Sequence, residues 1–471
     1  MEGGLSINSN AIDIKSQILY HVAKSAWEGT LFERREEICD MVSKEFQDQK
    51  TRRYVANQIR MAMGLTPHNE DHVLNDYDEE ALMGMGSEPV IYVNSDACQM
   101  CPEGERHCEI ACPLNAITRD ELGKTTIDQE KCMGEGHCID ACSFGALSEK
   151  SQFIPLIKLL KDQKSPVYAS VAPAFVGQFG SDVTPGKLRS ALLALGFADM
   201  VETALYADLI TMKEAFEFED HVKTAHDFMF TSCCCPVWIK LIENKFPDLV
   251  EHISPSVSPM IASARVIKQF EPEAKVVFIG PCIAKKSEAL LPDLKGAIDY
   301  VLTFQELATI FEAAEINPAR QDDHEKSAAS WSGRVYAYTG GVSAAVDATL
   351  QKLIPHHSQK LEPIKVDSIP DCQKLLEQIK NGELTANFVE GMACKGGCVG
   401  GPGRLIPPEQ GREFVLTYGN AASVHTPVEN PQVYGILARL GHENDALSLT
   451  GTSPMAELLA RKLGEKLLIP K

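Results

Sequence analysis

The sequence lacks the features that would place the protein in a membrane, outside the cell or on nucleic acid. No apolar stretch approaches the roughly 18 to 20 residues that a membrane-spanning helix needs. The N-terminal stretch MEGGLSINSNAIDIKSQ contains neither the basic region nor the apolar region of a secretory signal. Basic residues are outnumbered, since 45 lysines and arginines face 65 acidic residues and give a net charge of -20. We therefore expect a cytoplasmic protein that binds neither membranes nor the phosphate backbone of nucleic acids.

Cysteine, in contrast, is abundant. The 471 residues include 15 cysteines, and only Cys39 and Cys372 stand outside short clusters. Disulfide frameworks are typical of small secreted domains, whereas this chain is large and has no export signal. Adjacent cysteines, as at 233–235, are also poorly placed to pair with each other. The clusters therefore indicate metal or iron–sulfur ligation, and we expect the two isolated cysteines to be small buried hydrophobic residues.

The composition changes along the chain and predicts three regions. Apolar residues recur at helical spacing between residues 11 and 63, and Gly64 follows as a C-cap. Residues 66–89 are acidic and aperiodic, which is typical of a linker. Near the C-terminus, residues 455–468 have the pattern of a helix. The expected regions are an N-terminal helical segment with its linker (1–89), a cysteine-rich module (90–150) and a larger domain (151–471).

The larger domain has the pattern of an α/β fold with two lobes built around parallel or mixed sheets. Short apolar runs that end in glycine, proline or cysteine alternate with helical stretches. In such sheets, ligands bind beyond the carboxyl ends of the strands. Three of the five runs end in cysteine, so we expect thiolates at one edge of the sheet. The predicted strands are 167–173, 227–235, 275–282, 334–341 and 386–394, and the clearest helices are 187–196 and 236–245.

The cysteine-rich module resembles a bacterial two-cluster ferredoxin, whose repeated run is C-x2-C-x2-C-x3-C-P with the fourth cysteine crossing to the other cluster. We expect a small α+β domain that transfers electrons, because ordinary side chains cannot carry single electrons. Zinc is less consistent with the x3-Cys-Pro ending. The two runs are Cys98-x2-Cys101-x6-Cys108-x3-Cys112-Pro113, with a four-residue insertion, and Cys132-x5-Cys138-x3-Cys142.

By this pattern one [4Fe-4S] cluster has four cysteine ligands and the other has only three. Glu135 stands where the second run should have its second cysteine. The fourth ligand of that cluster is then Glu135, His137 or none, and the cluster is [4Fe-4S], glutamate-ligated or [3Fe-4S]. The ligand sets are Cys98, Cys101, Cys108 and Cys142 for the first cluster, and Cys112, Cys132 and Cys138 for the second.

Three motifs in the larger domain resemble those of the [FeFe]-hydrogenases. They are TSCCCPVW (231–238), GPCIAKKSE (280–288) and EGMACKGGC (390–398), against the family's TSCCPGW, PCxxKKxE and ExMACxxGC. The resemblance covers about residues 166–440. It implies an H-cluster, in which a [4Fe-4S] cubane is bridged by a cysteine to a two-iron unit with CO, cyanide and a dithiolate. The implied cubane ligands are Cys235, Cys282, Cys394 and Cys398, with Cys398 as the bridge.

The resemblance also implies roles for side chains around the two-iron unit. Lys285 would donate a hydrogen bond to a cyanide ligand and balance its charge. Met392 would pack beside the bridging CO, and the Ala172-Pro173 turn would line the opposite side. The chain departs from the family pattern at Gly280, where a methionine is usual, at Met260, where a glutamine is usual, and at Pro402, which interrupts a glycine run.

A proton relay follows from the same resemblance. The cysteine before the cubane ligand, Cys234, would donate protons beside the dithiolate, although the extra Cys233 competes for this role. Glu214 and Glu217 are three residues apart, which puts both carboxylates on one helix face. The implied relay runs from Cys234 through Glu214 and Ser254 to Glu217 at the surface, with Glu288 near that exit.

These features predict a hydrogenase from a divergent branch with two accessory clusters, catalysing 2H+ + 2e- ⇌ H2. Ferredoxin or flavodoxin would be the redox partner, and hydrogenase maturation proteins would insert the cofactor. One alternative is a hydrogen sensor with low turnover. Another is a hydrogenase-like iron–sulfur assembly protein, which would need neither Lys285 nor the acidic relay.

Overall fold

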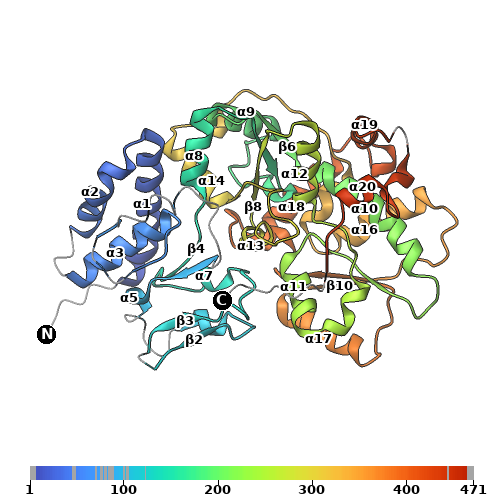
Figure 1. The fold of residues 1–471 in the computed structure, drawn as a ribbon, viewed down its shortest axis with the longest axis horizontal. Helices are drawn as coiled ribbons and strands as arrows, with labels where there is room; N and C mark the ends of the chain where they lie inside the picture. The colour runs from blue at the N-terminus through green and yellow to red at the C-terminus, as the bar shows by residue number, and fades with distance from the viewer. Residues whose placement is uncertain are drawn as a thin grey trace.

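The computed structural model describes most of the chain. The described residues are 7–44, 49–68, 70, 72–74, 78, 82, 90–98, 101, 106–121, 123–442 and 445–463. Most of the predicted linker at 66–89 and the end of the predicted helix at 455–468 lie outside them. Figure 1 shows the N-terminal helices at one end of the molecule, the cysteine-rich module beside them and the larger domain beyond. None of the described helices combines the length and the hydropathy needed to cross a membrane.

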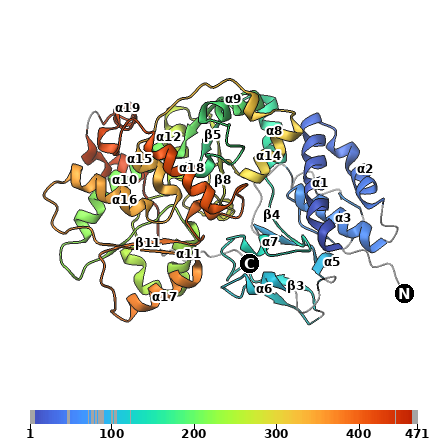
Figure 2. The same ribbon diagram turned by 180° about the vertical axis from the view of Figure 1, so that it is seen from behind.

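The N-terminal segment forms three helices, as its periodicity predicts. They are α1 (Ile7–Glu28), α2 (Leu31–Ser43) and α3 (Gln49–Ala62), and Gly64 ends α3 with a positive φ of 84°. Helix α1 packs against α8 (Phe153–Asp162) and α14 (Phe304–Ala313). Figure 2 shows the same neighbours from behind. The segment is therefore docked on the rest of the chain.

Residues 90–150 form a small unit of short strands and single-turn helices. Strand β1 (Ile91–Val93) pairs antiparallel with β4 (Leu147–Glu149), and β2 (Ile117–Arg119) pairs antiparallel with β3 (Thr125–Ile127). The helices α5 (Ser95–Cys98), α6 (His107–Ile110) and α7 (His137–Asp140) each contain one cysteine. Elements this short form few hydrogen bonds of their own. Their positions therefore depend on contacts with α3 and on whatever the cysteines bind.

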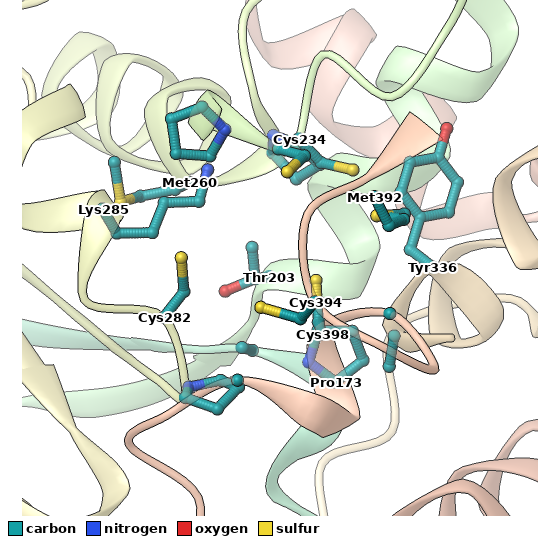
Figure 3. A pocket seen from close by; sticks show the side chains of 18 of the residues that line it. Pro173, Thr203, Cys234, Met260, Cys282, Lys285, Tyr336, Met392, Cys394 and Cys398 are labelled. Atoms are coloured by element: carbon teal, nitrogen blue, oxygen red, sulfur yellow. The ribbon is translucent and has the colours of Figure 1, made fainter. Parts of the chain in front are cut away.

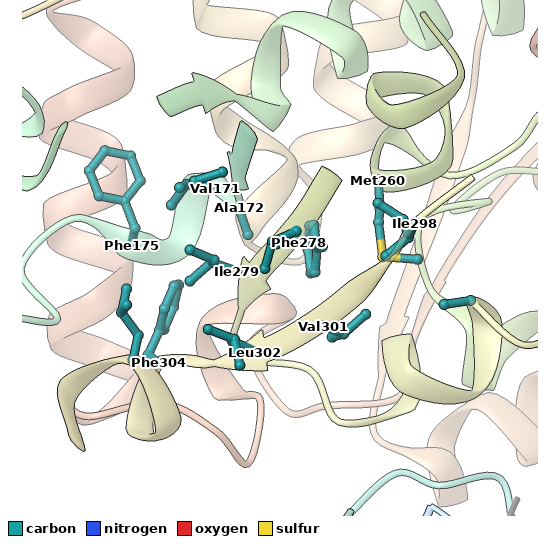
Figure 4. Close-up of a cluster of buried hydrophobic side chains, with 14 of the residues drawn as sticks. Val171, Ala172, Phe175, Met260, Phe278, Ile279, Ile298, Val301, Leu302 and Phe304 are labelled. Carbon is teal, nitrogen blue, oxygen red and sulfur yellow. The ribbon is translucent and has the colours of Figure 1, made fainter. Parts of the chain in front are cut away.

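The larger domain contains two parallel sheets, which confirms the predicted α/β class. The first has the order β6-β5-β8-β9, and the second has the order β10-β11-β7. The apolar side chains of the first sheet pack around Phe278, Ile279 and Phe304, as Figure 4 shows. The strands are β5 (Val167–Val171), β6 (Asp199–Glu202), β7 (Met229–Phe230), β8 (Lys275–Gly280), β9 (Tyr300–Thr303), β10 (Pro363–Asp367) and β11 (Phe388–Met392).

Helices cover both sheets. The long ones are α9 (Pro185–Leu195), α10 (Thr203–His221), α11 (Pro236–Lys245), α12 (Pro259–Phe270), α16 (Gly341–Leu353), α17 (Ile369–Lys380), α18 (Pro408–Asn420) and α19 (Pro431–Arg439). The short ones are α13 (Ala284–Glu288), α15 (Trp331–Arg334) and α20 (Pro454–Leu458). Short 3-10 turns include η2 (Pro173–Phe175), η3 (Pro247–His252), η5 (Val335–Ala337) and η6 (Cys398–Gly400).

Two sequence-based predictions of secondary structure are wrong. Residues 334–341 form the end of α15 and the turn η5 instead of a strand. Residues 335–338 are all buried, and Arg334 forms an ion pair with Glu202 at 3.1 Å. A half-buried strand would instead have alternated burial. The C-terminal helix ends at Leu458, because Ala460 then pairs antiparallel with Ser256.

Candidate functional site

A cavity lies between the two sheets of the larger domain, beyond the carboxyl ends of β5, β8 and β11. Ala172 and Pro173 follow β5 and line it, and Met392 ends β11 and also lines it. The arrangement matches the expectation that parallel sheets present their ligand sites at this edge. Five cysteines contribute to the wall, namely Cys234, Cys235, Cys282, Cys394 and Cys398. Figure 3 shows the side chains of Cys282, Cys394 and Cys398 directed into one space.

The three adjacent cysteines face different surroundings. The preceding Ser232 has a φ of 67°, a strained left-handed conformation that turns the chain between β7 and α11. Cys235 is the N-cap residue of α11. Both Cys234 and Cys235 line the cavity. Cys233 does not line it; this thiol donates to the carbonyl oxygen of Val257 at 3.4 Å. Cys233 and Cys234 therefore occupy separate positions.

Two residues of the third motif have packing roles that the sequence did not show. A Cβ atom on Gly391 would lie 2.4 Å from Cδ2 of Trp238, so only glycine lets this strand lie against the indole ring. The ring donates from Nε1 to the carbonyl of Thr231 at 3.1 Å, which joins the two ends of the first motif, and the N–H of Thr231 donates to the carbonyl of Val389 in β11 at 3.0 Å. The carboxylate of Glu390 accepts from the backbone N–H of Gly340 and of Ser343 and so holds the N-terminus of α16.

Lys285 lies in the cavity wall and pairs with Glu288. Their Nζ and Oε2 atoms are 2.5 Å apart, and both side chains are buried. Burial alone would lower the pKa of Lys285, but Glu288 and Cys282 outweigh it and the net pKa is raised. The ammonium therefore stays charged beside the cysteines. The placement of Glu288 near a surface exit is wrong, because its side chain has no exposed area.

Glu214 is a buried carboxyl group that joins the first motif to α10. Thr231 donates from Oγ1 to its Oε2 at 2.7 Å, while Oε1 is buried without a hydrogen-bond partner among the residues that the structure describes. Burial, followed by the charge of Glu217, raises the pKa of Glu214 to about 8. Burial raises the pKa of Cys233, and the negative charge of Glu214 raises it as well, because the two groups are neighbours. The carboxyl is therefore protonated at neutral pH.

Glu217, one turn further along α10, has the opposite environment. Its carboxylate accepts from Ser254 Oγ at 2.6 Å and from Ser256 Oγ at 3.1 Å, and it forms an ion pair with Lys213. The glutamate is 8% exposed, so this is the end of the group nearer the solvent. The structure thus brings Cys233, Glu214, Ser254 and Glu217 together.

The seven cysteines of residues 90–150 fall into two groups of neighbours. Burial, together with the charges of Cys142 and Cys98, raises the pKa of Cys108 to about 11. Burial likewise raises the pKa of Cys138, and there Cys132 and Glu135 contribute. The structure therefore groups Cys98, Cys101, Cys108 and Cys142, and separately Cys112, Cys132 and Cys138 with Glu135.

The second of these groups lies against the larger domain. Burial is the main cause of the raised pKa of Cys394, and Glu135 is among the charges that add to it. His137 Nδ1 lies 3.3 Å from Glu135 Oε2. Asp140 of the same helix pairs with Arg404 of the larger domain at 3.5 Å. Glu135 is thus close enough to the cavity for its charge to act on Cys394.

Sequence reasoning missed several residues of the cavity wall. Phe278 lines it, and a Cβ on Gly280 would lie 2.8 Å from the Phe278 ring, so this ring occupies the space beside the glycine. Met260, which the sequence marks as a departure from the family pattern, also lines the wall. Tyr336 was overlooked because its segment had been predicted as a strand; its hydroxyl accepts from Thr211 Oγ1 at 2.9 Å.

The donors around the cavity fit an iron–sulfur cofactor. Four of the wall's thiols come from three separate segments, and soft thiolate ligands select zinc, copper or iron–sulfur clusters over hard cations. The remaining walls of the cavity are mainly apolar. Lys285 is the one lysine in this wall and suits an anionic group. A cubane with an attached anionic group therefore fits these residues.

Comparison with known proteins agrees with this reading. A family model for the C-terminal domain of the iron-only hydrogenase large subunit matches residues 165–402. Iron hydrogenase 1 of Clostridium pasteurianum is 30% identical over 418 residues, which cover 75% of this chain and 71% of that protein. Cytosolic iron-sulfur assembly component 3 of Rattus norvegicus is 25% identical over 303 residues, covering 52% and 62%. A solved structure of an apo [FeFe]-hydrogenase variant from Chlamydomonas reinhardtii shares the fold over 65% of this chain and 98% of its own, with a TM-score of 0.54 and 23% identity.

Proposed function

Because the chain belongs to the iron-only hydrogenase family, we propose that it is a hydrogenase that interconverts H2 with protons and electrons. The observation that carries this proposal is the cavity in which four family-motif cysteines and Lys285 meet, with a chain of carboxyl and hydroxyl groups behind it. Cys235, Cys282, Cys394 and Cys398 would hold the cofactor. When bound, the H-cluster would supply the redox chemistry of hydrogen, which no side chain provides.

The cavity residues bind and orient this cofactor and keep water away from it. Lys285 provides a fixed positive charge for an anionic ligand, and Glu288 holds its ammonium in place. Met392, Met260 and Phe278 supply apolar walls. The turn at Ala172 and Pro173, which follows β5, forms the wall at that end of the cavity. A dry, low-dielectric pocket strengthens the effect of the single lysine charge on whatever anion binds there.

The proton path begins at Cys234, which lines the cavity, and continues on the side of Cys233 and Glu214. Glu214 is protonated at neutral pH because its pKa is about 8, so it can hold the proton within the protein. Ser254 donates to Glu217, whose carboxylate forms an ion pair with Lys213. These groups could pass a proton between the cavity side and the solvent side of α10.

Electrons would reach the cavity through two accessory clusters of a ferredoxin-like module. We assign residues 1–89 to the helical segment with its linker, 90–150 to this module and 151–471 to the catalytic domain. The proximity of Glu135 to Cys394 supports the cluster of Cys112, Cys132 and Cys138 as the one next to the catalytic centre. Ferredoxin or flavodoxin would deliver electrons to the other cluster, in the cytoplasm, and maturation proteins would complete the H-cluster.

Hydrogen turnover tests the proposal. The full chain is produced anaerobically with the hydrogenase maturation proteins, and H2 release from a reduced viologen is measured beside a Cys398→Ser variant. We expect turnover in the parent and a loss of at least about a hundredfold in the variant. A parent that carries its full iron content, yet releases no more H2 than the variant, would overturn the proposal. Slow parent turnover that Cys234→Ala leaves unchanged would indicate a sensor instead.

The similarity to an iron–sulfur assembly component favours a second candidate function. An assembly protein would need cubane ligands but no anion anchor and no proton path. Burying the Lys285–Glu288 pair and Glu214 costs free energy of folding. An assembly role would give these buried groups no function. Restored iron–sulfur enzyme activity in cells that lack an assembly factor, without any H2 turnover, would favour the assembly role.

A further inference from the structure

The hydroxyl group of Tyr54 is buried in α3 without a hydrogen-bond partner. The side chain is 4% exposed, and Oη has no partner among the described residues. A hydroxyl removed from water without a partner costs roughly 1 to 3 kcal/mol, so buried hydroxyls normally find an acceptor. Burial raises the pKa of Tyr54 to about 12, the nearby Gln58 side chain opposes this increase, and the negative charge of Cys142 adds to it. Tyr54 belongs to the same buried apolar cluster as Cys98 and Ala146, and Cys142 packs against that cluster.

Contacts on both sides of Tyr54 fix its helix over the cysteine loops. Asn94 donates from Nδ2 to the carbonyl oxygen of Tyr54 at 3.0 Å, and Gln58, one turn later, donates from Nε2 to the carbonyl of Gly145 at 2.8 Å. Gly145 lies three residues after Cys142. The same helix face thus spans the turn that follows Cys142, with Tyr54 one turn before the contact.

A third contact anchors the other side of the same cluster. Arg53 binds Asp96 with two hydrogen bonds, from Nε at 2.8 Å and from Nη2 at 2.5 Å. Asp96 precedes Cys98 by two residues in α5, and Figures 1 and 2 both show α5 beside α3. Tyr54 is therefore held between the segments that present Cys98 and Cys142.

From this placement we infer that the Tyr54 hydroxyl donates a hydrogen bond to a sulfur atom of the accessory cluster bound by Cys98, Cys101, Cys108 and Cys142, and so raises the reduction potential of that cluster. The inference rests on the cluster assigned under the proposed function. Hydrogen bonds to the sulfurs stabilise the more negative, reduced form of an iron–sulfur cluster. The backbone N–H of Ala146 already donates to Cys142 Sγ at 3.3 Å, so Tyr54 would be a further donor.

Gln58 is the alternative acceptor for the hydroxyl. Its amide N–H donates to Gly145, and the Gln58 side chain lies close enough to the Tyr54 hydroxyl to lower the pKa of the tyrosine, although the two side chains form no hydrogen bond of normal geometry. A shift of the Gln58 amide would satisfy Tyr54 without any cluster. In that case the tyrosine would be only a packing residue, and the cluster potential would not depend on its hydroxyl.

An EPR-monitored redox titration of the full holoprotein separates these possibilities. Tyr54→Phe removes one oxygen and keeps the ring, and we expect the midpoint potential of this cluster to become more negative than in the parent. Tyr92→Phe is the matched control, because the Tyr92 hydroxyl donates to the carbonyl of Gly64 at 3.3 Å and no cysteine contributes to its raised pKa. We expect this control to leave the potential unchanged.

The possible outcomes are distinct. An unchanged potential in Tyr54→Phe, with full iron content, would overturn the inference. A parent without the EPR signal of this cluster would instead overturn the proposed accessory cluster. If the phenylalanine variant fails to fold, 3-fluorotyrosine at position 54 keeps the packing and strengthens the donor, and a more positive potential would then support the inference. An unchanged potential with 3-fluorotyrosine would overturn it.

Discussion

Thr231 donates a hydrogen bond from Oγ1 to Oε2 of Glu214 across 2.7 Å, and this contact connects the triple-cysteine motif to helix α10. Both side chains are fully buried. The bond lowers the pKa of Glu214, but burial and the charge of Glu217 raise it by more, and the result is about 8. A carboxyl group with this pKa changes its charge near physiological pH, as expected for a group that passes protons.

The first prediction concerns Glu214 and the pH dependence of stability. Its folded pKa of about 8 lies above the ordinary value of 4.5, so the folded state holds a proton that the unfolded state releases between these pH values. Rising pH therefore removes stability in this window. We expect Glu214→Gln, which cannot ionise, to become increasingly more thermostable than the parent from about pH 5 to about pH 9.

Thermal unfolding of the unmatured chain at several pH values tests this prediction. Glu219→Gln is the control on the same helix, because hydrogen bonds from Ser358 contribute to the lowered pKa of Glu219 although burial opposes them. Its stability difference from the parent should stay constant over this range. A constant difference for Glu214→Gln as well would contradict a raised pKa at Glu214. Turnover of the matured variant should also fall.

The second prediction concerns the buried pair of Lys213 and Glu217. Their side chains are 6% and 11% exposed, and removing one partner leaves the other charge buried. We expect Lys213→Met to lower the free energy of unfolding by about 3 kcal/mol, and Lys213→Met with Glu217→Gln to recover part of this loss. Denaturant unfolding measures both. Lys223→Met, in an exposed pair with Glu219 at 3.7 Å, should change little. Equal effects of the two lysine variants would refute the prediction.

The third prediction concerns the contact between Gly391 and Trp238. A methyl group at position 391 would lie 2.4 Å from the indole ring, so we expect Gly391→Ala to destabilise the protein by about 1 to 3 kcal/mol. Gly435→Ala provides a control with the opposite sign. Nothing lies within 4 Å of its Cβ position in α19, and alanine should add roughly 0.5 to 1 kcal/mol. Unfolding midpoints that rank the two variants in the opposite order would contradict the packing argument.

The fourth prediction separates the two cysteines before Cys235. Cys234 lines the cavity, whereas Cys233 donates to Val257 and lies beside Glu214. Cys234→Ser should reduce turnover by about a hundredfold or more with unchanged iron content. Cys233→Ser keeps a hydroxyl in the same place and should cost less than about tenfold. If Cys233→Ser gives the larger loss, the order of these two residues in the relay is reversed.

The motifs predicted the residues around the cavity better than periodicity predicted the strands. Motif cysteines follow β8 and β11, whose apolar runs are long enough to be recognised. The strands β6, β9 and β10 were missed because they end in Glu202, Thr303 and Asp367, whereas the predicted runs end in glycine, proline or cysteine. Residues 334–341 were wrongly predicted as a strand, because a buried turn can contain as many apolar residues as a strand does.

The side chains around the relay depend on packing that no local pattern encodes. The contacts between Lys213 and Glu217 and between Thr231 and Glu214 were not predicted, because the first looks like an ordinary surface pair and the second joins separate elements. Tyr336 reaches the cavity from a turn that the pattern assigns to a strand. The position of Glu288 was also not predicted, because its ion pair with Lys285 holds it in the buried cavity wall.

The most direct test of the account is the infrared spectrum of the anaerobically matured protein. If Cys235, Cys282, Cys394, Cys398 and Lys285 hold an H-cluster, CO and cyanide stretching bands should be present and should shift when H2 replaces the inert gas. The same preparation of Lys285→Met should retain the cubane by EPR and lose these bands. A parent spectrum without CO or cyanide bands, in protein whose cubane is intact, would contradict the central claim.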